Sequence, residues 1–250
     1  EWLRGVENTF NKIGYPDVSM AMCSRDTTFI MGLPARLPGR ELGENELYQF
    51  VETPYFDDPE DYQKILQMGW DAWNMQYMMK INGFTTPEEL FARFGELGAN
   101  MGMTIGWFIQ HGVVPCFEQA CAPIFATLSM VRSMSEFTFD MYDDPGVIMD
   151  VINKFQPGAI EQTIGTCKQF GARKVGIFAM RSSATFISPD MFKEYVWPSL
   201  KQMIVSFHEA GLVSILHADG NWLPMIPYFA EDLPKGSLHV ELDGDTDIFK

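Results

Sequence analysis

The sequence of 250 residues has little cysteine, little positive charge and no long hydrophobic run. Its four cysteines (Cys23, Cys116, Cys121 and Cys167) are too few and too scattered for a disulfide framework, and there is no CxxC pair. Reduced thiols are typical of the cytoplasm, where we expect the protein to be located. No run of about 18 apolar residues occurs and no signal peptide opens the chain, so we expect no membrane span.

Positive charge is scarce. The 18 Lys and Arg residues face 33 Asp and Glu residues, which gives a net charge of −15. An acidic surface repels phosphate groups, and this excludes nucleic acid and anionic membranes as favoured partners. We therefore expect a small-molecule substrate. The oligomeric state is left open, with a homodimer as one candidate.

The composition is otherwise that of a globular protein, with 46% hydrophobic residues, 17 Met and 14% aromatic residues. We predict a single domain over 1–250, in which 1–56 is an irregular segment rich in Pro and Gly. The sequence has no initial Met, and it stops at DGDTDIFK, where we expect a new helix to begin. We therefore expect N- and C-terminal parts to be missing.

Strand and helix patterns alternate from Gly112 onward. Apolar segments predict strands at 112–118, 173–180, 212–217 and 237–242. The intervening segments predict helices at 123–135, 143–170, 188–210 and 221–230, with Pro157 expected to kink or split the second. Two earlier helices are expected at 59–80 and from 85 towards 110. This order predicts an α/β fold with a parallel sheet. No GxGxxG follows the first strand, so a (β/α)8 TIM-type barrel is favoured over a dinucleotide-binding sheet.

The stretch Leu212–Asn221, LVSILHADGN, is the centre of this prediction. A short buried strand ends in His217, and Asp219 lies two residues further on, so both side chains point to one side of an extended chain. An imidazole and a carboxylate can hold a metal ion, or act as a base and its orienting group. The alternative is structural, with a His at a strand end and an Asp that begins a turn.

Polar residues follow each predicted strand, and in a barrel such residues converge on one mouth. They are Glu118, Arg181, the pair His217 and Asp219, and the pair Glu241 and Asp243. Because mixed His and carboxylate ligands suit zinc as a Lewis acid, we predict His217, Asp219 and Glu118 as zinc ligands. Glu118 and His217 are the predicted catalytic residues. An ion pair between Glu118 and Arg181 is the alternative for Glu118.

Met and aromatic residues near this mouth predict an apolar site. The predicted substrate-binding residues are Arg181, Met180, Phe117, Trp222 and Glu241. Filling of the space between barrel and helices is the alternative for the apolar ones. The other histidines, His111, His208 and His239, are interpreted as structural.

Several segments resemble the uroporphyrinogen decarboxylase superfamily. They are DDPGVIMDVINKF, SSATFISPDMFKEYVWPSLKQMI, HEAGLVSILHADGN and HVELDG, and together they span the C-terminal part from Gly112. The resemblance implies a (β/α)8 barrel. One branch of that superfamily decarboxylates uroporphyrinogen without a cofactor, and it carries an R-x-x-G-R loop whose spacing matches Arg36 and Arg40.

The other branch comprises cobalamin-dependent methyltransferases with zinc bound by a His-x-Cys pair and a later Cys. His217 falls on the family's histidine, whereas Asp219 stands where the family has Cys, and the later Cys would lie beyond Lys250. The resemblance implies a methyltransferase acting between a small substrate, such as an aryl methyl ether, and a corrinoid. The corrinoid would come from a partner protein, because no D-x-H-x-x-G segment occurs. A cofactor-free decarboxylase and a non-catalytic binding protein are the alternatives.

Overall fold

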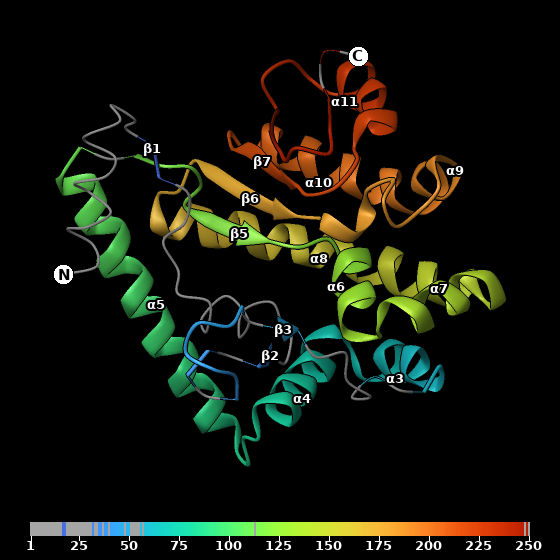
Figure 1. Ribbon diagram of the computed structural model, residues 1–250, viewed down its shortest axis with the longest axis horizontal. Helices are drawn as coiled ribbons and strands as arrows, with labels where there is room; N and C mark the ends of the chain where they lie inside the picture. The colour runs from blue at the N-terminus through green and yellow to red at the C-terminus, as the bar shows by residue number, and fades with distance from the viewer. Residues whose placement is uncertain are drawn as a thin grey trace. The chain divides into compact units, whose positions relative to one another are not determined.

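The computed structural model describes residues 17–18, 32, 35–36, 38–39, 41–47, 49–50, 56, 58–112, 114–247 and 249 (Figure 1). The chain forms two compact units: Glu1–Tyr55 with Asp71–Glu118, and Phe56–Trp70 with Gln119–Lys250. The single domain over 1–250 stays a prediction. Most of the segment 1–56 lies outside the described residues. None of the described helices is long and apolar enough to cross a membrane.

The described residues of the first unit form two strand pairs and two long helices. Strands β1 (Asp17–Val18) and β4 (Val114–Pro115) pair in parallel, and β2 (Ala35–Arg36) pairs with β3 (Gln49–Phe50) in antiparallel fashion. The helices are α4 (Trp70–Asn82) and α5 (Pro87–Gln110). The predicted start of α5 is confirmed, because Thr86 and Glu89 form a capping box that satisfies backbone N–H groups there.

The second unit is built on a parallel sheet of four strands in the order β5-β6-β7-β8. These strands are β5 (Gln119–Cys121), β6 (Lys174–Phe178), β7 (Val213–Ala218) and β8 (Leu238–Leu242). The α-helices of this unit are α3 (Glu60–Met68), α6 (Ile124–Val131), α7 (Met134–Asp143), α8 (Pro145–Phe170), α9 (Pro189–Met191), α10 (Trp197–Glu209) and α11 (Ile226–Asp232). Shorter helical turns are η2 (Met180–Ser182), the π-helical η3 (Phe192–Val196) and η4 (Leu223–Met225).

The register of the sheet aligns the carboxyl ends of its last three strands. Phe178 on β6 pairs with His217 on β7, which in turn pairs with Glu241 on β8. Helix α8 packs against β5 and α10 packs against β7, and Figure 1 shows α8 running alongside β5 and β6. Val175 and Ile177 on β6 are fully buried, as is typical of a parallel strand covered on both faces.

Several element boundaries differ from those predicted. The strand expected at 112–118 is replaced by β4 and β5, which fall in different units. The helix expected at 59–80 is divided into α3 and α4 at Gly69, whose φ of 93° favours glycine. Pro157 does not split α8; it lies on the exposed face, where water can satisfy the carbonyl that proline leaves free. Helix α7 was not predicted.

Candidate functional site at the carboxyl ends of β7 and β8

The ends of β7 and β8 bring an imidazole and two carboxylates together. His217 Nδ1 lies 3.0 Å from Glu241 Oε2, and His217 Nε2 lies 3.4 Å from Asp219 Oδ1. We call these three residues the histidine cluster. The side chains are 32% (His217), 53% (Asp219) and 38% (Glu241) exposed, so a small molecule can reach them. The ring of Phe178 lies 5.2 Å from that of His217 and covers one side of it.

The contacts of His217 assign its protons. An ionised carboxylate only accepts hydrogen bonds, so Nδ1 must donate to Glu241. In a neutral imidazole, Nε2 then carries a lone pair, and it faces an oxygen of Asp219 that also carries lone pairs. Two acceptors at this distance repel each other unless a proton or a cation lies between them. Either a proton on Nε2 or a cation bound between the two atoms would make this contact favourable.

Residues after β8 form hydrogen bonds with the loop that follows β7. The Gly220 N–H donates to Asp243 Oδ2 over 2.7 Å, and Thr246 Oγ1 donates to the Gly220 carbonyl over 2.8 Å. The same hydroxyl accepts from the Trp222 N–H over 2.9 Å. The hydrogen bonds from Gly220 and then Asp245 lower the pKa of Asp243. These bonds fix the backbone next to Asp219.

The same loop is also tied to the segment after β6. The Asn221 N–H donates to Thr185 Oγ1 over 3.0 Å, and the Ala184 N–H donates to the Asn221 carbonyl over 2.8 Å. At Gly220, where φ is 84°, a Cβ atom would lie 2.7 Å from both Ser183 Oγ and Thr185 Oγ1. Only glycine fits there. The loops after three neighbouring strands therefore form one connected rim.

The buried side chain of Trp222 stabilises this loop by packing and by a hydrogen bond. Its side chain is fully buried, packs against Phe192 and Phe229, and donates from Nε1 to the Asp219 carbonyl over 2.9 Å. The prediction that Trp222 contacts substrate does not fit this burial. Its large apolar ring belongs to the core, and only its N–H reaches the site, through the backbone.

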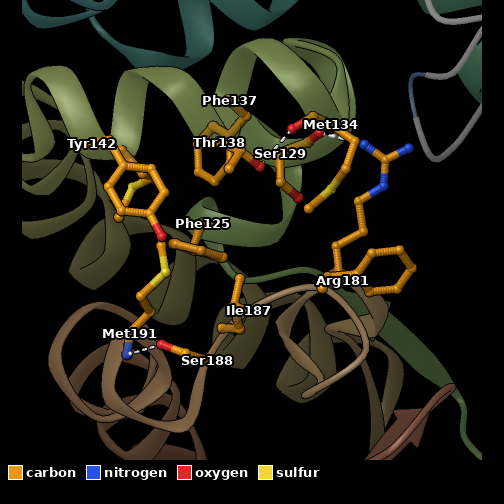
Figure 2. Close-up of a pocket in the computed structure, with 12 residues that line it drawn as sticks. Phe125, Ser129, Met134, Phe137, Thr138, Tyr142, Arg181, Ile187, Ser188 and Met191 are labelled. Carbon is orange, nitrogen blue, oxygen red and sulfur yellow. Dashed lines mark hydrogen bonds between the residues drawn. The ribbon is translucent and has the colours of Figure 1, made fainter.

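Arg181 and Met180 follow the carboxyl end of β6, in η2. Both are half-buried, and an Arg181 Nη1–H donates to the Ser129 carbonyl in α6. Arg181 also lines a pocket of about 110 Å³ between α6, α7 and the segment from η2 to α9. Figure 2 shows Arg181 on one side of this pocket, with Tyr142 and Met191 on the other.

Glu118 and Phe117 are placed differently from the prediction. Glu118 was expected to end a strand, but it directly precedes β5, whose carboxyl end is Cys121. It is half-buried, and Phe117 is 4% exposed. Both belong to the first unit, whereas the histidine cluster belongs to the second. Glu118 is therefore not the end of a strand as expected, and its grouping with His217 stays a prediction.

The donor set for a metal ion is incomplete in the described part of the chain. No group of three or more His, Cys, Asp or Glu side chains among those residues is arranged to hold a metal. Because Glu118 belongs to the other unit, the three-ligand set of His217, Asp219 and Glu118 stays a prediction. Cys121, at the end of β5, lies beside Met203, and burial raises the pKa of its thiol to about 12.

The decarboxylase interpretation depends on two arginines, and the structure describes one of them. Arg36 lies in β2 and is exposed, whereas Arg40 lies outside the described residues. Sequence reasoning also missed the role of Thr246. Its partners lie 24 and 26 positions earlier in the chain, so no local pattern could have indicated these hydrogen bonds.

The family comparison agrees with this architecture. The model of the family described as uroporphyrinogen decarboxylase (URO-D) matches residues 108–250, which is more than half of the chain. The chain therefore belongs to the uroporphyrinogen decarboxylase family. No curated protein sequence matches the chain.

One solved structure extends the comparison to the fold. The chain is similar to a methyltransferase from Methanosarcina mazei, with a TM-score of 0.50 and 16% sequence identity. The match covers 87% of this chain and 56% of that chain, so the present chain spans a little over half the length of that structure. The predicted α/β fold class of the TIM-barrel type is confirmed, and β5–β8 supply successive parallel strands of it.

Proposed function

We propose that the chain is part of a methyltransferase that moves a methyl group between a small substrate and a corrinoid carried by a partner protein. Family membership and the fold shared with the methanogen methyltransferase support this proposal. The observation that carries it is the 3.4 Å separation between His217 Nε2 and Asp219 Oδ1. Two atoms bound to one zinc ion in tetrahedral geometry stand about 3.4 Å apart, from ligand distances of about 2.0–2.2 Å.

His217 and Asp219 offer an imidazole nitrogen and a carboxylate oxygen, which are groups that bind zinc. Glu241 would hold the Nδ1 proton and leave the Nε2 lone pair to the metal, as a carboxylate hydrogen-bonded to a zinc-binding histidine does. Asp219 would contribute an oxygen, and Glu118 remains the predicted third ligand. Zinc bound there would supply a Lewis acid that polarises the oxygen or sulfur atom bearing or accepting the methyl group.

The chain's other residues would hold and orient the substrate. Phe178 covers the imidazole on one side. The hydrogen bond between Gly220 and Asp243 holds the loop that carries Asp219. Arg181 and Met180 follow the neighbouring strand, at the same end of the sheet. We propose that they contact the substrate, of which an aryl methyl ether is one candidate.

The test is the zinc content of the purified protein, measured by mass spectrometry. We expect about one zinc ion per chain in the wild type and about none in the His217→Ala variant, because the variant loses the proposed nitrogen ligand and keeps only carboxylates. His239→Ala is the matched control, since His239 is exposed on β8 and outside the cluster. Equal zinc in wild type and His217→Ala, or no zinc in either, would exclude the proposed site.

A second candidate is a cofactor-free decarboxylase of a polycarboxylated tetrapyrrole. The family description and the exposed position of Arg36 favour it. Paired arginines bind carboxylates in bidentate fashion, so this activity would depend on Arg36 and Arg40 and not on zinc. Decarboxylation of a porphyrinogen by the metal-free protein, lost in Arg36→Met, would support this function.

A further inference from the structure

The segment Asp219–Trp222 follows β7 and has no regular secondary structure. Its three peptide units carry three carbonyl groups and three N–H groups, and each of these six groups forms a hydrogen bond. The partners are Trp222 Nε1, Asp243 Oδ2, Thr185 Oγ1, the Ala184 N–H and, for two of the groups, Thr246 Oγ1. Any other conformation of this segment would have to replace these partners, because unpaired backbone groups are costly.

Thr246 supplies two of these six hydrogen bonds. Its hydroxyl donates to the Gly220 carbonyl over 2.8 Å and accepts from the Trp222 N–H over 2.9 Å. The residue is 6% exposed, so water has little access to replace the hydroxyl. An apolar side chain of the same shape would leave one acceptor and one donor of the loop backbone without a partner.

Thr246 belongs to the turn that follows β8, and this turn is itself ordered. The Thr246 N–H donates to the Asp243 carbonyl over 3.4 Å, and Asp243 Oδ2 accepts from the Gly220 N–H over 2.7 Å. Two positions before Asp243, Glu241 Oε2 lies 3.0 Å from His217 Nδ1. This short segment at the end of β8 therefore holds both the imidazole and the loop after β7.

The carboxylate of Asp219 depends on this backbone for its position. Its side chain is 53% exposed, so packing against neighbours does little to place it. The Asp219 carbonyl accepts from Trp222 Nε1 over 2.9 Å, and the Trp222 N–H is in turn bound by Thr246. The 3.4 Å separation between Asp219 Oδ1 and His217 Nε2 is therefore set through the backbone of the loop.

We infer that Thr246 is a positioning residue for a cation held by His217 and Asp219, and that it acts through the backbone of the loop. This inference rests on the proposed zinc site. With the hydroxyl in place, the loop is ordered before the cation binds, and binding costs less conformational entropy. Without the hydroxyl, the cation must first order the loop, so its affinity falls although both ligand side chains are unchanged.

Two substitutions of Thr246 separate its hydroxyl from its shape. Thr246→Val retains the shape and removes the hydroxyl, whereas Thr246→Ser retains the hydroxyl. Competition with a chelating dye measures the zinc affinity of each purified protein. We expect the affinity to fall about tenfold in Thr246→Val, as when other groups that hold metal ligands in place are lost, and to stay close to the wild-type value in Thr246→Ser. Thr163→Val, which removes a hydroxyl that donates to the Ala159 carbonyl over 2.9 Å within α8, is the matched control and should leave the affinity unchanged.

Hydrogen exchange tests the loop in the absence of metal. The Gly220 and Asn221 N–H groups are bound by Asp243 and Thr185, and not by Thr246. In the metal-free protein both amides should nevertheless exchange faster in Thr246→Val than in the wild type, because the whole loop loses order. Equal exchange in the two proteins would overturn the inference.

The zinc measurement separates this inference from the proposed function. Equal zinc affinity in the wild type and Thr246→Val would overturn the inference and leave the zinc site in place, and so would an equal loss in Thr246→Ser or Thr163→Val. A wild-type protein that binds no zinc would overturn both. If Thr246→Val does not fold, exchange in the metal-free wild type decides. The amides of Gly220, Asn221 and Trp222 should exchange more slowly than in the unfolded chain, and unprotected amides would contradict the role of Thr246.

Discussion

Two clusters of ionisable side chains in the second unit use the same chemical groups in opposite ways. In what we call the buried cluster, Arg132 donates to Asp140 over 2.7 Å and to the Phe56 carbonyl over 3.0 Å, and Tyr62 donates to Asp140 over 2.9 Å. The Arg132 and Asp140 side chains are only 3% and 11% exposed. In the histidine cluster, exposures range from 32% to 53%, and His217 Nε2 lies 3.4 Å from Asp219 Oδ1.

The difference separates a stabilising network from a binding site. Each donor of the buried cluster named above meets an acceptor, and burial, followed by the charge of Asp140, raises the pKa of Tyr62 and keeps its proton in place. Such a network has no capacity left for a ligand. The histidine cluster, by contrast, lies within reach of solvent, where His217 and Asp219 are accessible to a ligand.

The largest expected effect is on stability, from the buried cluster. Arg132→Met should lower the free energy of unfolding by about 3–5 kcal/mol, because it leaves the Asp140 carboxylate buried without its cation. His217→Ala should change it by less than about 1 kcal/mol, since the side chain is half-exposed. Urea denaturation measures both. If the two variants lost the same stability, the contrast between the clusters would be wrong.

An intermediate effect is expected on metal affinity. Glu241→Ala should weaken zinc binding about 10–100-fold, because the carboxylate holds the Nδ1 proton and orients the ring. Glu241→Gln should cost less, since its amide oxygen still accepts that proton. Competition with a chelating dye measures the affinity, with His239→Ala as the unaffected control. Unchanged affinity in Glu241→Ala would show that Glu241 does not orient His217.

The histidine cluster could largely be predicted from the sequence, whereas the buried cluster could not. Strands β6, β7 and β8 form within two residues of the predicted bounds, because short apolar segments between helices have few alternatives in a parallel sheet. Their common register then places His217 next to Glu241. Glu118 was misplaced because an apolar run, VVPCF, does not show where a short strand ends. The roles of Arg132 and Thr246 depend on partners distant in the sequence.

The smallest effect is a local dependence on pH. Hydrogen bonds from the Gly220 and Asp245 N–H groups hold the pKa of Asp243 below its ordinary value of 3.8. Above pH 3.8 the carboxylate is ionised and accepts both hydrogen bonds. As the pH falls through the lowered pKa, the carboxylate is protonated and these hydrogen bonds weaken. The amide NMR signal of Gly220 should titrate below pH 3.8, and Asp243→Asn should abolish that step. A midpoint at or above 3.8 would contradict the hydrogen-bonded geometry.

The hydrogen bonds between Thr246 and the loop after β7 also determine when that loop can take its final conformation during synthesis. Thr246 follows Gly220 by 26 residues, and its hydroxyl bonds both Gly220 and Trp222. On the ribosome, the strand that carries His217 is therefore complete before the residues that hold its loop have been made. The imidazole and Asp219 reach their final distance only when β8 and the turn beyond it have joined the sheet. A nascent chain halted before Thr246 would carry His217 and Asp219 and still lack the hydrogen bonds that hold the loop between them and β8.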